Sequence, residues 1–264
     1  GPQELQGRSC GVLSGYGHHP TGLGAYASRQ TYMEGFAIDQ TGRLLRQKIL
    51  AYAAEMLGCS AEELDIVEGN VVRKDNGAVE MDLSHLAMTA QYNPVHSEHI
   101  TAESTATIRS NAYSFGCTFA EVEVDIPMCK VTLKRIINVH DCGRLINPAL
   151  AKAQVHGGMS MGIGYGLSEC LKFDPKTGKT LNGTLLDYKL STTMDHPELK
   201  ADFVENYEPT SAYGTKALGE PPVCSVAPAI RNAVFNATGV GVDALPLSPH
   251  VLFEEFRKGG LLDV

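Results

Sequence analysis

A stretch with a glycine at every fourth position limits the folds open to this chain more than any other feature of its sequence. Asn147-Pro148 is typical of a helix start, and helical spacing continues from there to about Cys170. One face of this predicted helix carries a glutamine and three glycines: Gln154, Gly158, Gly162 and Gly166. Each glycine costs about 1 kcal/mol of helix stability relative to alanine. Close contact of this face with another backbone or with a ligand must offset that cost.

The other segments alternate between helical and strand spacing, which predicts an α+β fold with mixed sheets and packed helices. Helical spacing or capping signals mark residues 41–57, 82–92 and 226–237. Strand spacing marks two antiparallel strands between residues 113 and 142, and further strands at 185–193 and 203–207.

Charge and cysteine spacing exclude several classes of protein. The net charge is −8 and no basic run occurs, so we expect no nucleic-acid partner. No apolar stretch reaches the roughly 18 residues of a membrane-spanning helix, and no basic-then-apolar leader is present, so we expect a cytoplasmic protein without a membrane partner. The seven cysteines lack the paired spacing of zinc or iron-sulfur motifs and are expected to be reduced thiols.

Glu220 is the strongest candidate for a catalytic side chain. It lies between the permissive Gly219 and the rigid Pro221-Pro222, directly before the predicted helix at 226–237. A residue before proline is steered away from the α region, so we expect an extended backbone at Glu220. A carboxylate fixed in apolar surroundings suits a general base. The alternative is a structural glutamate at a helix entry with proline in the first turn.

Two further features suit ligand binding. Gly22-Leu-Gly24-Ala-Tyr-Ala27 formally matches a dinucleotide fingerprint, but no strand precedes it, as that motif requires. A glycine-rich turn can still present backbone N–H groups to a phosphate or to a metal-bound oxygen, and Ser28 and Arg29 add side-chain donors. Gln154 has donors and acceptors to offer a heterocycle. The histidine spacings do not predict a conventional metal site.

Three ordered motifs resemble those of one enzyme family. They are AYASRQ near the start, GRLINPALAKAQVHGGMSMGIGYGLSE in the middle, and YGTKALGEPPVCSVAPAIRNAV towards the end. Together they resemble the molybdenum hydroxylases of the xanthine dehydrogenase family, in the C-terminal portion of the molybdopterin-binding subunit of the bacterial type. The resemblance runs in order from about Gly22 to Phe256. It implies two molybdopterin-binding subdomains, residues 1–110 and residues 111–264, of which the second carries the catalytic loop.

The resemblance also implies roles for individual residues. Glu220 takes the place of the family's catalytic glutamate, the general base to the molybdenum-bound hydroxide. Ala27 takes the place of a residue whose backbone lies beside the molybdenum. The remaining implied cofactor contacts are Ser28, Arg29, Gln154, Lys216 and Gly219.

The implied reaction is the hydroxylation of a purine, xanthine or hypoxanthine, or a related N-heterocycle, with water as the source of oxygen. The implied cofactor is molybdenum-molybdopterin, with the cytosine dinucleotide form left open, and [2Fe-2S] and FAD centres are expected on other domains or subunits. The implied partners are the N-terminal half of the molybdenum subunit, the [2Fe-2S] subunit, the FAD subunit and a small heterocyclic substrate. Two alternatives stay open: a nicotinate- or aldehyde-oxidising relative, and a non-catalytic fragment unable to hold the cofactor without its missing half.

Overall fold

The computed structural model describes residues 25–105, 107 and 110–263 of the chain. The chain divides into two compact units, of which one contains Tyr32–Arg109 and the other contains Ala25–Thr31 together with Ser110–Val264. The sequence-based division assigned all of residues 1–110 to the first subdomain, and the structure differs in one segment, because Ala25–Thr31 packs with the second unit. Most of the predicted glycine-rich turn, including Gly22 and Gly24, lies outside the described residues.

The first unit packs two helices with a small antiparallel sheet. The π-helical turn η1 (Gln30–Glu34) spans the boundary between the two units. The other elements of the first unit are α2 (Gly35–Leu57), the 3-10 turn η2 (Ala61–Glu63), β1 (Leu64–Val67), β2 (Asn70–Arg73), β3 (Val79–Asp82) and α3 (Leu83–Tyr92). The strand order is β1-β2-β3. Gly58 ends α2 in the left-handed conformation, and the Asp82 carboxylate caps α3. Both helices predicted in this part of the sequence are confirmed.

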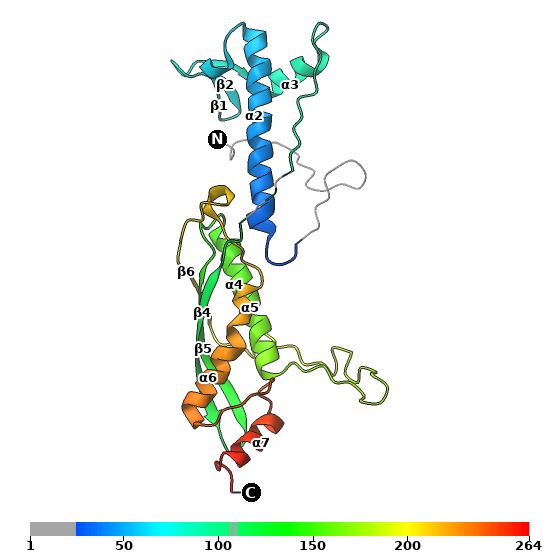
Figure 1. Cartoon of the computed structure of the whole chain (residues 1–264), viewed down its shortest axis with the longest axis vertical. Coiled ribbons are helices and arrows are strands. Elements are labelled where there is room, and N and C mark those ends of the chain that lie inside the picture. The colour runs from blue at the N-terminus through cyan, green and yellow to red at the C-terminus, as the bar shows by residue number, and fades with distance from the viewer. Residues whose placement is uncertain (1–24, 106, 108–109, 264) are drawn as a thin grey trace. The chain divides into compact units, whose positions relative to one another are not determined.

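The second unit is a three-stranded sheet with helices packed on it (Figure 1). Its strands are β4 (Phe115–Asp125), β5 (Lys130–Asp141) and β6 (Leu199–Phe203). Its helices are α4 (Pro148–Leu167), the 3-10 turn η3 (Ala212–Gly214), α5 (Pro221–Cys224), α6 (Val226–Thr238) and α7 (Pro249–Lys258). β4 and β5 pair antiparallel, as the sequence predicted, and β6 adds to β5 in parallel.

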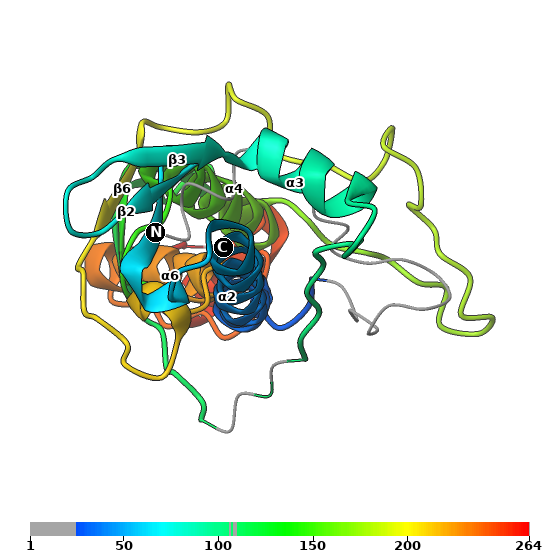
Figure 2. The same cartoon turned by 90° about the horizontal axis from the view of Figure 1, so that it is seen from above.

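The segment Ser168–Glu198 joins α4 to β6 without a helix or strand of its own, and it extends away from the sheet in both views (Figures 1 and 2). The predicted strand at 185–193 is therefore wrong: its leucines are exposed and no neighbouring strand pairs with it among the described residues. The strand predicted at 203–207 forms four residues earlier, as β6, where Ile136 to His140 offer backbone partners.

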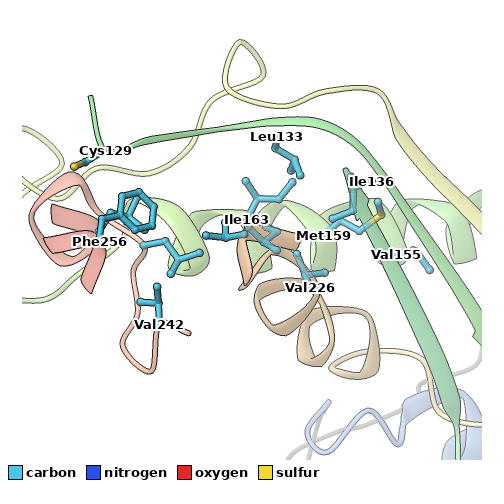
Figure 3. Close-up of a cluster of buried hydrophobic side chains, with 13 residues drawn as sticks. Cys129, Leu133, Ile136, Val155, Met159, Ile163, Val226, Val242 and Phe256 are labelled. Atoms are coloured by element: carbon cyan, nitrogen blue, oxygen red, sulfur yellow. The ribbon is translucent and has the colours of Figure 1, made fainter. Parts of the chain in front are cut away.

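The core of the second unit lies between the sheet and the helices (Figure 3). Leu133 and Ile136 of β5 point towards Met159 and Ile163 of α4 and Val226 of α6. Alternation along β5 accounts for this arrangement, because every second side chain faces the helices except where the register shifts beside Glu121. The α+β fold predicted from the sequence is confirmed. Within the described residues, no helix is both long enough and apolar enough to cross a membrane.

The glycine face of α4 is the contact surface for α5 and α6. A methyl group added at Gly158 would lie 2.6 Å from Pro222 Cβ, and one added at Gly166 would lie 3.2 Å from Ala227 Cβ. At Gly162 the added methyl group would meet the side chain of Val226. The predicted close contact of this glycine face is confirmed, because the glycines allow the backbone of α5 and α6 to approach closely.

Two neighbouring glycines of α4 offer a matched test of this contact. Gly157 is exposed, and an added methyl group would meet nothing within 4 Å. Gly157→Ala should therefore raise the free energy of unfolding by up to about 1 kcal/mol through helix propensity. Gly158→Ala should lower it by about 1–3 kcal/mol, because the methyl group overlaps Pro222. Urea unfolding of the two variants measures both effects, and equal stabilisation by both would contradict the packing.

Candidate functional site

The candidate site residues come from three distant parts of the sequence and meet in the second unit. Ala27–Arg29 lie directly before η1, Gln154 lies on α4, and the remaining candidates lie in residues 214–220, which we call the 214–220 loop. The loop runs from η3 to the start of α5.

The end of β5 holds the first half of the loop. The backbone N–H of Arg144 donates to the Gly214 carbonyl over 2.8 Å, and the N–H of Lys216 donates to the Cys142 carbonyl over 2.7 Å. Thr215 forms a bridge with Gly143. The loop therefore continues the hydrogen bonding of the sheet for a few residues beyond the last strand position.

Side chains from two other elements bind the second half of the loop. The hydroxyl of Ser114 donates to the Ala217 carbonyl over 2.6 Å. The Gln154 amide donates from Nε2 to the Leu218 carbonyl over 3.2 Å. Both carbonyls would otherwise lack a partner in irregular backbone, so these side chains fix the direction in which the loop approaches α5.

Ser28 contacts the residue that the sequence singled out as the base. The Glu220 N–H donates to Ser28 Oγ over 2.6 Å. Ala27 and Ser28 both have positive φ, at 50° and 55°, a conformation that is costly for residues with a side chain. A methyl group added at Gly219 would lie 2.8 Å from Ser28 Oγ, so only glycine allows this approach.

Glu220 itself differs from the prediction in two ways. Its backbone is in the α region, at φ −76° and ψ −30°, instead of extended. The reason is that Glu220 begins the α5 turn, in which its carbonyl accepts from the Val223 N–H over 2.9 Å, and this bond outweighs the bias imposed by Pro221. The side chain is exposed among the described residues, whereas the sequence argument expected apolar surroundings. Glu220 thus has the geometry of a helix-entry residue whose carboxylate is accessible.

Lys216 is buried, and its ammonium is paired with a carboxylate. Nζ lies 2.6 Å from Asp141 Oδ2. Burial raises the pKa of Asp141. Hydrogen bonds from Lys216, the Gly143 N–H and Asn206 together lower this pKa by more than burial raises it, so it lies below its usual value. The sequence prediction gave Lys216 as a cofactor contact, and the structure directs its side chain to Asp141.

Arg29 lies over the ring of Tyr26, with Cζ 4.2 Å from the ring centroid. No group of three or more His, Cys, Asp or Glu side chains is arranged to hold a metal ion in the described part of the chain. The side chains that bind the backbone of Leu218 and Glu220 are a carboxamide and a hydroxyl, those of Gln154 and Ser28.

Sequence reasoning missed two residues that hold the 214–220 loop. Ser114 precedes β4 in a segment without periodicity, so no signal marked it. Asp141 had a usable signal, because it is an acidic residue at the end of an otherwise apolar strand, directly before Cys142-Gly143. Buried acids are rare unless paired, so its partner could have been sought among the lysines.

His140, next to Asp141, is another buried ionisable group in this region. It is 1% exposed, and neither ring nitrogen makes a hydrogen bond of normal geometry within the described residues. Burial lowers the pKa of His140, and a weak interaction with the Phe115 backbone only partly opposes this effect. His140 is therefore neutral in the folded protein at neutral pH.

This burial predicts a loss of stability in mild acid. Below about pH 6.5 the unfolded chain protonates this histidine while the folded protein does not, so falling pH favours unfolding. The urea midpoint should fall between pH 7.5 and pH 5.5, and His140→Leu should weaken that dependence because leucine binds no proton in either state. An unchanged pH dependence in His140→Leu would show that other groups cause it.

Comparisons with known proteins agree with one another. The family model of the molybdopterin cofactor-binding domain matches residues 16–197. The xanthine dehydrogenase molybdenum-binding subunit of Escherichia coli O157:H7 is 49% identical over 244 residues, which are 92% of this chain and 32% of that protein.

Two solved structures share the fold. Reconstituted CO dehydrogenase from Oligotropha carboxidovorans matches with a TM-score of 0.80 and 26% identity, over 92% of this chain and 31% of that one. Quinoline 2-oxidoreductase from Pseudomonas putida 86 matches with a TM-score of 0.81 and 26% identity, over 91% of this chain and 32% of that one. The chain spans about a third of the length of the curated relatives that it matches.

Proposed function

Because the chain belongs to the molybdopterin cofactor-binding domain family, we propose that it forms part of a molybdenum hydroxylase that oxidises a purine or a related N-heterocycle. The observation that carries this proposal is the convergence of Ser28, Gln154 and the 214–220 loop around Glu220. These residues are far apart in the sequence and become neighbours only in the fold. A helix-entry glutamate with a purely structural role would not need such support.

The polar groups around Glu220 fit a pterin cofactor. The Ser28 oxygen accepts from Glu220, which leaves its own proton to donate, and Gln154 Oε1 can accept a hydrogen bond while Nε2 holds Leu218. Neutral donors and acceptors of this kind match the edge of a heterocycle, and Arg29 adds a positive charge suited to a phosphate. The absence of a ligating side-chain cluster among the described residues fits a metal that is carried by an organic cofactor.

We propose specific roles for the residues of the site. The cofactor, when bound, supplies the two-electron redox chemistry. Glu220 accepts the proton that is released as an oxygen atom derived from water is transferred to an electron-poor ring carbon. The backbone at Ala27 and the side chains of Ser28, Arg29 and Gln154 face the cofactor. Gly219 gives Ser28 room to approach, so the base and the cofactor contacts share one scaffold.

Xanthine or hypoxanthine is the proposed substrate class. The support is the 49% identity to a protein described as the molybdenum-binding subunit of a xanthine dehydrogenase. A nicotinate- or aldehyde-oxidising activity is the alternative, and a substrate panel on the native assembly distinguishes them. We also propose a cytoplasmic location, and electron transfer to [2Fe-2S] and FAD centres on other domains or subunits, as in the family resemblance.

The proposed base is tested by Glu220→Gln in the native assembly that contains this chain. Glutamine keeps the shape and most of the hydrogen bonding but cannot accept the proton. Xanthine turnover per molybdenum should fall by about 10²- to 10⁴-fold, with the molybdenum content nearly unchanged. Steady-state rates and metal analysis measure the two quantities.

Glu121→Gln is a matched control, because Glu121 is also exposed and lies on β4, away from the loop. It should keep the wild-type rate. If Glu220→Gln retains near wild-type turnover per molybdenum, Glu220 is a structural helix-entry residue and the proposed mechanism is wrong.

The exposed leucines of Ser168–Glu198 support a large protein partner. The segment is ordered at its base by Ser168 and Glu169, whose side chains bond to the Lys189 carbonyl and the Tyr188 hydroxyl. Beyond this base, large apolar side chains face solvent: Leu171, Phe173, Leu181, Leu185, Leu186, Leu190 and Met194. Apolar clusters of this size normally mark an interface. Because the relatives are about three times as long, we propose that the rest of the molybdenum subunit covers this segment.

The isolated chain should therefore be inactive and should self-associate. Supplied with cofactor, it should show no xanthine oxidation, and sedimentation should give a mass above 28.4 kDa. Leu185→Ser combined with Leu186→Ser, at positions 77% and 79% exposed, should reduce self-association. Val95→Ser, at a position 94% exposed outside the segment, should not. An active monomer would contradict the proposed partner.

A further inference from the structure

A single buried ion pair connects the end of β5 to the 214–220 loop. The side chains of Lys216 and Asp141 are 4% and 12% exposed, and Nζ lies 2.6 Å from Oδ2. The ammonium also lies over the ring of Phe115, with Nζ 5.6 Å from the ring centroid. Asp141 also accepts from the Gly143 N–H over 2.9 Å and from Asn206 over 3.3 Å. The carboxylate is thus held from β5 and from the segment after β6.

Stability alone does not explain this pair. Removing two charges from water costs about as much as their attraction returns, so a buried pair adds little net stability compared with apolar side chains. What the pair does impose is geometry, because neither charge can move without leaving the other unpaired in the interior. A pair of this kind defines where Lys216 must lie relative to β5.

The position of Lys216 determines the position of Glu220. Lys216 is bound twice to β5, through its ammonium and through its N–H to the Cys142 carbonyl. Only three residues separate it from Glu220, and the Ala217 and Leu218 carbonyls are held by Ser114 and Gln154. A segment this short, with its carbonyls hydrogen-bonded, cannot absorb a displacement of Lys216, so a shift at Lys216 moves Glu220 as well.

We infer that Lys216 is a positioning residue: paired with Asp141, it sets the location of the Glu220 carboxylate, and it acts on the reaction through this pair instead of through a contact with the cofactor. The inference rests on the proposed function, because it gives Glu220 the role of the base. It differs from the role that the sequence resemblance implied for Lys216.

The test compares a single with a double variant in the native assembly. Lys216→Met leaves the Asp141 charge buried and unpaired, so the loop should move. The value of kcat for xanthine should fall by at least about 10-fold, while KM changes less than about 3-fold and molybdenum per chain stays near wild type, since misplacements of about 1 Å cost up to about 100-fold. Adding Asp141→Asn removes the buried charge and keeps an acceptor for Gly143, so kcat should recover to within about 3-fold of wild type.

A direct cofactor contact predicts a different pattern. The double variant would then be as impaired as Lys216→Met, and both would lose molybdenum. A third pattern, in which Lys216→Met lowers the midpoint of thermal unfolding but keeps the wild-type kcat, would make the pair purely structural. Either result overturns the inference, whereas the proposed function fails separately if Glu220→Gln stays active.

Two further variants complete the design. Lys134→Met removes the lysine of an exposed ion pair with Glu123 on the same sheet, and it should leave kcat unchanged. If Lys216→Met does not fold, Lys216→Arg replaces it, since arginine keeps the charge but not the dimensions of the ammonium. Its kcat should fall with molybdenum content retained, and a wild-type kcat in Lys216→Arg would overturn the inference.

Discussion

The close approach of α4 to α5 and α6 is the contact on which the rest of the second unit depends. Three glycines on one face of α4 allow Pro222, Val226 and Ala227 to reach the helix backbone. This contact places the start of α5 over the same face from which Gln154 projects towards the 214–220 loop. The glycines weaken α4 as an isolated helix, and the packed core of the unit compensates for that weakness.

The position of Glu220 follows from this helix packing and from three side chains that hydrogen-bond to the loop. Ser28, Ser114 and Gln154 each bind a different backbone group of the loop, and the Asp141–Lys216 pair holds its beginning. A carboxylate that is accessible but attached to such a constrained backbone combines exposure to a ligand with a defined location. The site therefore owes its order to backbone contacts more than to burial of the reacting group.

Local signals in the sequence were sufficient for the elements that carry their own pattern. The glycine face of α4 and the helical segments that became α2 and α3 are each determined by patterns within a few residues, and they were predictable. The position of β6, four residues before the predicted strand, was not predictable, because its limits depend on which part of β5 offers free backbone groups. The α conformation of Glu220 also escaped prediction, since the bond that favours it forms only when α5 does. Ser114 and the partner of Lys216 required knowledge of contacts between segments 75 or more residues apart.

The bond between Ser28 and Glu220 has a consequence for the order of events during synthesis. Its two partners are 192 positions apart in the chain, and Tyr32–Arg109 of the first unit are made between them. Ribosomes deliver the earlier partner first, so Glu220 cannot support the costly conformation of Ala27 and Ser28 until it has been made. A contact between residues so far apart in the sequence forms late in folding. The Ser28 side of the site and the 214–220 loop can therefore join only after both segments have been made.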